Sequence, residues 1–190
     1  MAIKEGWPGR FYEDFAVGDV YRHRLGRTIT ETDNIWFTLL TCNTNPSHFN
    51  VEYAKRMEFG KLLVNSAFTL ALVAGLSVSD LSENAVANLG WGEITLPHPV
   101  YVGDTLYAES EVLETRESRS RPYAGIVGVR TRGLNQDGVV VIEYTRTFMV
   151  YKRDAAPVRD LFPQPAAGRP GRPRNPGAAG ARPRGRGGKG

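Results

Sequence analysis

The chain has 190 residues, is 41% hydrophobic and carries a net charge of +4, which suits one globular domain with additional residues at its ends. No stretch approaches the roughly 20 apolar residues that span a bilayer, and the first fifteen residues lack a signal-peptide core, so we expect a cytoplasmic protein. The single cysteine, Cys42, excludes an intramolecular disulfide and argues against a cysteine-based zinc site.

The first part of the chain predicts a strand followed by a helix. Residues 11–29 contain a Val-Gly-Asp turn and then the alternating run YRHRL, which is typical of a strand. A helix is predicted to start at Thr30, because Thr30 and Asp33 have the spacing of a capping box, with Asp in place of the usual Glu. Residues 43–46 should end this helix, since Asn-Pro disfavours helical backbone. Its apolar face consists of Ile35, Trp36, Leu39 and Leu40.

The second part is a strong helical signal. Residues 51–59 predict one short helix. The stretch 62–78 is apolar on nearly all sides and predicts a long helix that starts close to Asn65 and Ser66, with Ser66 as the expected N-cap. A helix that is apolar all round in a chain of this kind is a core helix enclosed by other elements. We therefore expect the rest of the domain to wrap around it.

The third part predicts successive β-strands. The segments ANLGWGEITLP, GDTLYAESEVLETRES, YAGIVGVRTRGLNQ and GVVVIEYTRTFMVYKR have strand composition, and the Asn-Gln-Asp-Gly sequence between the last two predicts a hairpin. One apolar helix together with a run of antiparallel strands predicts an α+β fold in which the sheet wraps the helix.

The C-terminal residues differ from the body in charge. Residues 163–190 hold six arginines, one lysine and no acidic residue, a charge of +7, so the remaining 17 basic and 20 acidic residues carry −3. Gly and Pro dominate and no apolar period is present, so we expect residues 154–190 to be a disordered tail behind a 1–10 extension and a single 11–153 domain. Cationic attraction to RNA or a membrane surface is one interpretation of the tail. We favour an extension without function, because no aromatics are interleaved to stack on bases.

The order of these elements resembles a known family. A helix ending in N-x-N-P-x-H, a short helix, F-G-x-L-L-V-N-S opening the apolar helix, and then LPHPVYVGDTLYAESEVLE resemble the MaoC-like dehydratases, which include the R-specific enoyl-CoA hydratases. The resemblance covers about residues 11–152. It implies the hot-dog fold, an antiparallel sheet around one long helix. It also implies a hydro-lyase that adds water to a 2-enoyl-CoA or removes it from a 3-hydroxyacyl-CoA.

The resemblance assigns catalytic roles to His48, Asn43 and Ser66. Imidazole titrates near neutral pH, so His48 can act as base or acid. The family's aspartate is replaced by Asn43, and an amide can orient water but cannot take its proton. His48 then either works alone, or the substrate brings its own carboxylate, as a short branched dicarboxylic thioester of the mesaconyl-CoA or itaconyl-CoA type would. The backbone N–H of Ser66 would stabilise the thioester enolate at the helix N-terminus.

Other polar residues are expected to surround the substrate. Asn45 should shape the loop together with Pro46, and Asn65 should line the same pocket, although capping is an equally simple role for Asn65 and Ser66. Arg119, Arg121 and Arg130 are candidates for the CoA phosphates, although solvated arginines are more common. His23 and His98 are expected to be structural. No metal site and no nucleotide cofactor is indicated.

Two further functions remain open. A hot-dog acyl-CoA thioesterase is one alternative, but such enzymes usually carry an acidic residue on or near the central helix, and residues 62–78 contain none. A non-catalytic acyl-CoA-binding module is the other, and Asn43 favours it. The expected partners are an acyl-CoA substrate and a second copy in a homodimer or higher homo-oligomer, with no membrane and no nucleic acid except through the tail.

Overall fold

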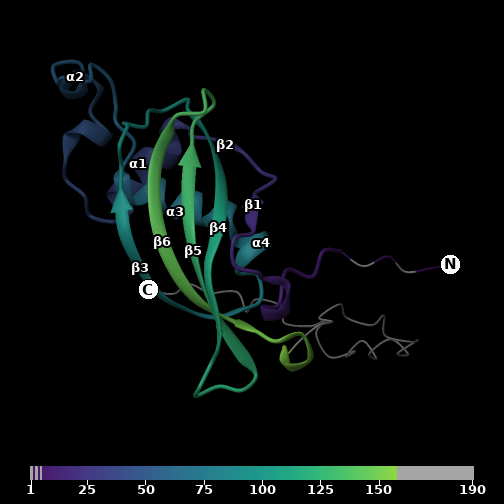
Figure 1. Ribbon diagram of the computed structural model, residues 1–190. Helices are drawn as coiled ribbons and strands as arrows, with labels where there is room; N and C mark the ends of the chain where they lie inside the picture. The colour runs from purple at the N-terminus through teal and green to yellow at the C-terminus, as the bar shows by residue number, and fades with distance from the viewer. Residues whose placement is uncertain (1, 3, 5, 158–190) are drawn as a thin grey trace, which may run out of the picture. The chain divides into compact units, whose positions relative to one another are not determined.

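The computed structural model describes Ala2, Lys4 and residues 6–157, so most of the predicted tail lies outside the described residues. The fold is an antiparallel sheet that curves around a helix (Figure 1). The strands follow the order β1-β4-β5-β6-β3, and β2 also pairs with β4. Their bounds are β1 Val20–Arg22, β2 Arg27–Thr28, β3 Ala85–Thr95, β4 Thr105–Glu117, β5 Ala124–Leu134 and β6 Val140–Tyr151. The predicted α+β hot-dog fold is confirmed.

The hairpin between β5 and β6 forms where the sequence predicts it. Gly138 adopts a φ of +75°, a left-handed conformation that glycine tolerates without steric cost. The side-chain oxygen of Asn135 accepts the N–H groups of Asp137 and Val139, each at 3.0 Å. This turn sets the register of two long strands, in which Arg130 is paired with Thr145.

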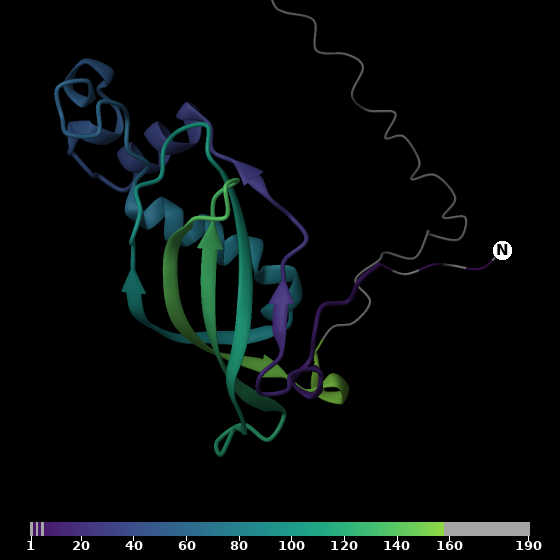
Figure 2. The same cartoon turned by 45° about the horizontal axis from the view of Figure 1, so that its top comes forward.

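The described helices lie on one face of the sheet and at one end of it (Figure 2). They are α1 Glu31–Leu40, α2 Val51–Ala54, α3 Ser66–Leu76 and α4 Val78–Leu81, with short 3₁₀ turns at Tyr12–Asp14, Pro46–His48 and Arg153–Ala155. Helix α1 begins as predicted, because Thr30 accepts the Asp33 N–H at 3.2 Å and the Asp33 carboxylate accepts the Thr30 N–H at 2.9 Å. None of the helices in the described part of the chain is long and apolar enough to cross a membrane.

The N-cap of α3 differs from the prediction. The helix begins at Ser66, and its N-cap is Asn65, whose side-chain oxygen accepts the Ala67 N–H at 2.9 Å. The helix therefore starts near Asn65 and Ser66, as the sequence predicts, but the predicted cap at Ser66 is wrong by one residue. The cause is tertiary, because Val64 donates its N–H to the Val100 carbonyl at 2.8 Å and so holds this segment extended.

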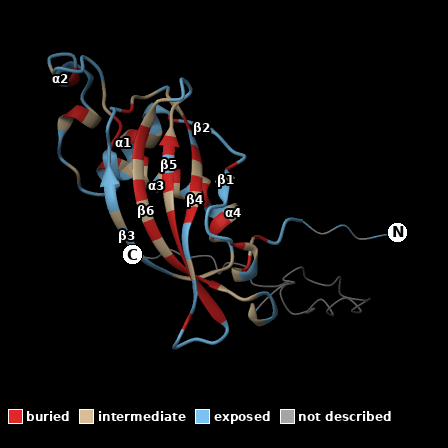
Figure 3. Cartoon of the chain, in the orientation of Figure 1, coloured by how far each residue is buried: buried red, intermediate tan, exposed pale blue. Residues whose placement is uncertain are grey.

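One cluster of buried apolar residues lies between α3 and the sheet, and a second contains Phe15, Leu81 of α4 and residues of β4, β5 and β6. The central strands are accordingly buried along much of their length (Figure 3). Val73 of α3 is fully buried over Gly133 of β5, and a Cβ at Gly133 would sit 2.7 Å from both Val73 and Ile142. Glycine at this position therefore permits the close approach of helix and strand. The sheet covers only one side of α3, since Ala71 and Gly75 remain exposed. The predicted enclosure of this helix is incomplete within a single chain.

Helix α1 turns three of its large apolar residues outward. Trp36, Leu39 and Leu40 are 66%, 56% and 75% exposed, whereas Asn34 and Thr38 are fully buried. The face that anchors this helix therefore combines buried hydrogen-bonding groups with the Phe37 ring, which packs 5.3 Å from the Phe68 ring of α3. The outward apolar face of α1 has no cover within the described part of the chain.

Residues ahead of the predicted domain are attached to it. The Trp7 indole N–H donates to the Ser79 carbonyl at 3.0 Å, and the Asn84 amide donates to the carbonyls of Pro8 and Arg10 at 2.8 and 3.1 Å. These bonds place residues 7–10 against the connection between α4 and β3. The ordered unit thus starts before residue 11.

A buried polar cluster joins β1 to α4 and the sheet. His23 is 5% exposed, with Nδ1 at 3.0 Å from an Asp80 carboxylate oxygen and Nε2 at 2.9 Å from the Ser110 hydroxyl. Ser110 in turn shares a 2.8 Å hydrogen bond with Thr131. Burial lowers the pKa of His23 below its ordinary value of 6.5, and the nearby Asp80 only partly offsets this effect. His23 therefore has the structural role that the sequence predicts.

We predict that His23 makes stability pH-dependent. Because its folded pKa is lowered, the unfolded chain binds more protons below about pH 6.5. This contribution to the free energy of unfolding is complete above that pH and is lost as the pH falls toward the folded pKa. Urea unfolding near pH 7.5, 6.5 and 5.5 should show the stability gap between wild type and His23→Gln narrowing with acidity. The exposed His98 supplies the control variant His98→Gln. If the free energy of unfolding changed with pH by the same amount in wild type, His23→Gln and His98→Gln, the prediction would be contradicted.

Candidate functional site

The loop after α1 is held by its own asparagine side chains. The Asn43 N–H donates to the Thr38 carbonyl at 3.0 Å, which closes the helix. The side-chain oxygen of Asn43 accepts the Asn45 N–H at 3.0 Å, and that of Asn45 accepts the Ser47 N–H at 3.1 Å. Asn45 thereby caps the 3₁₀ turn that ends in His48, as its predicted loop-shaping role requires.

His48 is half-buried and is oriented by a backbone carbonyl. Its Nδ1 lies 3.0 Å from the carbonyl oxygen of Leu63. A carbonyl can only accept, so in the neutral imidazole the proton is on Nδ1 and Nε2 carries the lone pair. The ring is thus oriented with Nε2 as a proton acceptor, the form that a general base needs.

The start of α3 lies beside this histidine. Leu63, whose carbonyl contacts the imidazole, also donates its own N–H to the Ser47 carbonyl at 3.1 Å. Three residues later Ser66 opens the helix, and its N–H has no acceptor among the described residues. The neighbouring Ala67 N–H is already taken by the Asn65 cap. The Ser66 N–H is therefore available to a negatively charged or polarised oxygen at the positive end of the helix dipole.

Two residues of α1, Asn34 and Thr38, belong to this site, and sequence reasoning missed them. The fully buried Asn34 amide contacts the backbone of His48, Leu63 and Asn65. The Thr38 hydroxyl accepts from the Asn65 amide at 3.2 Å. Their signal in the sequence was a pair of polar residues four apart on one helix face.

Both polar groups of the Asn65 side chain, which was predicted to line the pocket, make hydrogen bonds within the protein. It is 3% exposed, its oxygen caps α3, and its amide nitrogen bonds Thr38. Its capping role is therefore directly visible. Asn43, Asn45, His48, Asn65 and Ser66 come together in one region around the start of α3.

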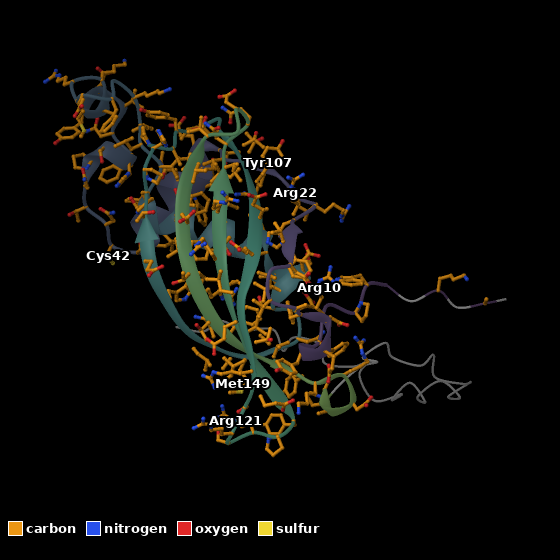
Figure 4. All side chains as sticks on the ribbon, viewed as in Figure 1. Arg10, Arg22, Cys42, Tyr107, Arg121 and Met149 are labelled. Atoms are coloured by element: carbon orange, nitrogen blue, oxygen red, sulfur yellow. The ribbon has the colours of Figure 1, made fainter. Side chains whose placement is uncertain are left out.

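The predicted arginines lie elsewhere in the same chain. Arg119 and Arg121 lie in the loop that follows β4. Strand β4 has 13 residues and is about 40 Å long, so this loop lies at the opposite end of the strand from the histidine loop. Figure 4 shows Arg121 and Met149 at the end of the sheet far from α2, and the Arg121 guanidinium is 3.6 Å from the Met149 sulfur. Arg130 pairs with Glu111 at 3.4 Å on the sheet. A single chain does not bring these arginines to His48.

A hollow of about 320 Å³ adjoins α1 and is lined by Trp36, Leu39 and Leu40. Its lining is the exposed apolar face of α1, whose last residue, Leu40, lies three positions before Asn43 in the chain. The hollow thus lies at the end of α1, a few residues before the loop that carries His48.

A curved antiparallel sheet around one central helix, with a histidine loop at the start of that helix, is the arrangement expected of a MaoC-like dehydratase. The family model for mesaconyl-CoA hydratase matches residues 3–160, and the chain belongs to this family.

Individual relatives agree with this assignment. The chain is 40% identical to mesaconyl-CoA hydratase of Cereibacter sphaeroides over 148 residues, covering 78% of this chain and 43% of that protein. It is 37% identical to beta-methylmalyl-CoA dehydratase of Chloroflexus aurantiacus, covering 77% of this chain and 42% of that one. A solved structure of a putative MaoC domain protein dehydratase from Chloroflexus aurantiacus superposes with a TM-score of 0.75 at 34% identity, covering 86% of this chain and 46% of that one. The chain thus spans less than half the length of these relatives.

Proposed function

We propose that this chain is a hydro-lyase that adds water to a 2-enoyl-CoA, or removes it from the 3-hydroxyacyl-CoA, with a short branched dicarboxylic acyl group of the mesaconyl type. The observation that carries the proposal is His48, oriented with Nε2 as acceptor beside the free N–H of Ser66. The 40% identity to a mesaconyl-CoA hydratase supports the acyl group.

The proposed reaction uses these two groups in turn. His48 Nε2 takes a proton from water as the oxygen attacks C3 of the enoyl thioester. The π electrons move toward the thioester carbonyl, and the Ser66 N–H stabilises the charge that develops on its oxygen. The imidazolium then gives its proton to C2, so that one C–O and one C–H bond replace the C2–C3 π bond and one O–H bond of water. Dehydration is the same sequence in reverse.

Asn43 is proposed to position water without exchanging protons. Its side-chain oxygen accepts one bond from Asn45 and retains a second lone pair for a water molecule. His48 then performs the acid–base chemistry alone, or shares it with a carboxylate of the substrate. Substrate assistance favours a dicarboxylic acyl group over a simple one.

A homodimer is proposed as the assembled form. Helix α3 is covered on one side only, and β3 is an edge strand with Leu89, Trp91 and Ile94 each at least 39% exposed. Exposed edges and large apolar surfaces are uncommon in monomers. A second copy aligned along β3 would cover both the edge and the open side of α3, as the second half of a longer relative could.

The first test is an assay with mesaconyl-CoA and crotonyl-CoA. Loss of the enoyl-thioester absorbance without release of free thiol is expected, and His48→Ala should lower kcat at least about 100-fold because the base is removed. His98→Ala is the matched control and should leave kcat unchanged. Thiol release would indicate a thioesterase instead, and no reaction with either compound would indicate a binding module. Full activity of His48→Ala would refute the site.

The second test restores the family's carboxylate with Asn43→Asp. Turnover of crotonyl-CoA should rise roughly tenfold, since a second proton acceptor becomes available. Turnover of mesaconyl-CoA should fall, because two carboxylates then repel each other. Parallel changes for both substrates would argue against substrate assistance.

The third test concerns the dimer and uses sedimentation velocity. Wild type should sediment as a dimer, and Leu89→Lys should shift it toward monomer because a buried lysine on a paired edge is costly. Val20 lies on the opposite edge strand, β1, and is 54% exposed, so Val20→Lys is the control that should remain dimeric. A monomeric wild type would exclude this assembly.

A further inference from the structure

We propose that Asn34 is a positioning residue that holds the base His48 and the N-terminus of α3 at a fixed mutual distance. This inference rests on the proposed function of that site. Asn34 does not face the reacting atoms, and it acts through the backbone of the groups that do.

Three hydrogen bonds of one side chain carry the inference. The Asn34 amide nitrogen donates to the His48 carbonyl at 2.9 Å and to the Leu63 carbonyl at 3.0 Å. Its oxygen accepts the Asn65 N–H at 2.9 Å. Two donors and one acceptor on a single planar group match the amide of asparagine, and the side chain is fully buried. Water therefore cannot replace these bonds at low cost.

The partners of Asn34 are the groups on which the proposed chemistry depends. The Leu63 carbonyl accepts from both Asn34 and His48 Nδ1, so the acceptor that sets the imidazole tautomer is itself held by Asn34. Asn65 directly precedes Ser66, whose N–H is the proposed oxyanion donor. The side chain of Asn34 thus links the loop that carries His48 to the start of α3.

The packing of α1 makes this link directional. Its exposed apolar residues contribute little anchoring, and the two residues of α1 that are fully buried are Asn34 and Thr38. Apolar contacts tolerate sliding, whereas an amide with three bonds fixes both distance and orientation. A shift of about 1 Å between catalytic groups can cost about 100-fold in rate.

The variant Asn34→Asp tests this role, because it keeps the acceptor for Asn65 and removes the two donors. As a carboxylate facing two carbonyl oxygens it should displace the His48 loop. Near pH 8, kcat with mesaconyl-CoA should fall about 100-fold with little change in KM. Near pH 6 a protonated carboxyl regains one O–H donor, so the deficit relative to wild type should shrink several-fold.

Asn84 provides a closely matched control. Its amide also donates to two backbone carbonyls, those of Pro8 and Arg10, in a part of the fold remote from the site. Asn84→Asp should lose stability while its folded fraction keeps wild-type kcat at both pH values. Urea unfolding of both variants at each pH separates loss of folding from loss of positioning.

A second readout does not require turnover. Nitrogen-15 NMR of the imidazole should show His48 as the Nδ1-protonated tautomer in wild type and as a mixture in Asn34→Asp near pH 8. If wild type turns over no enoyl thioester, the proposed function fails, and the tautomer still decides the positioning role. Wild-type kcat together with a wild-type tautomer in folded Asn34→Asp would overturn the inference.

Discussion

Helix α3 carries no charged side chain from Ser66 to Leu76, and the need to cover it organises the rest of the molecule. Four long strands curve around one side of it, and Gly133 allows Val73 to approach the sheet closely. The other side of the helix stays partly open, and it is this uncovered surface, with the β3 edge and the α1 face, that motivates a second copy. The apolar residues that remain uncovered in the single chain are thus the basis for proposing a homodimer.

Buried polar side chains gather around the N-terminus of this helix. An extended segment pairs with Val100 before the helix begins, and its Leu63 carbonyl points at the histidine. Because the first N–H groups of a helix lack internal partners, they require caps or ligands. Asn65 satisfies the Ala67 N–H, and the Ser66 N–H remains for a substrate oxygen in the proposed reaction. In the proposed mechanism, catalysis and N-terminal capping of the helix therefore use neighbouring backbone N–H groups.

Asparagine side chains dominate the region around His48. Asn43 and Asn45 shape the loop, and Asn65 caps α3. The buried Asn34 side chain bonds to both the loop and the start of α3. Amides supply both donors and acceptors without charge, so they can be buried in a network at lower cost than carboxylates. A site built mainly from neutral groups suits a substrate that carries its own negative charge.

Much of the architecture could be predicted from local patterns. Strand-like composition predicted the four long strands, Asn-Gln-Asp-Gly predicted the hairpin, and Thr30 with Asp33 predicted the start of α1. Each of these signals depends on neighbours within a few residues. The order of motifs around His48 indicated the family.

Contacts between distant segments decided the rest. Pairing of Val64 with Val100 keeps the chain extended up to Asn65, so that Asn65 and not Ser66 is the cap of α3. Asn34 looked like an ordinary helix residue, since its partners lie 14 to 31 positions away in the chain. The sequence by itself determined the main helices and strands, since backbone propensity and apolar period are local, and its motifs indicated His48 as the candidate base. Only the tertiary structure decided which backbone groups meet, because hydrogen bonds between remote segments depend on how those segments pack.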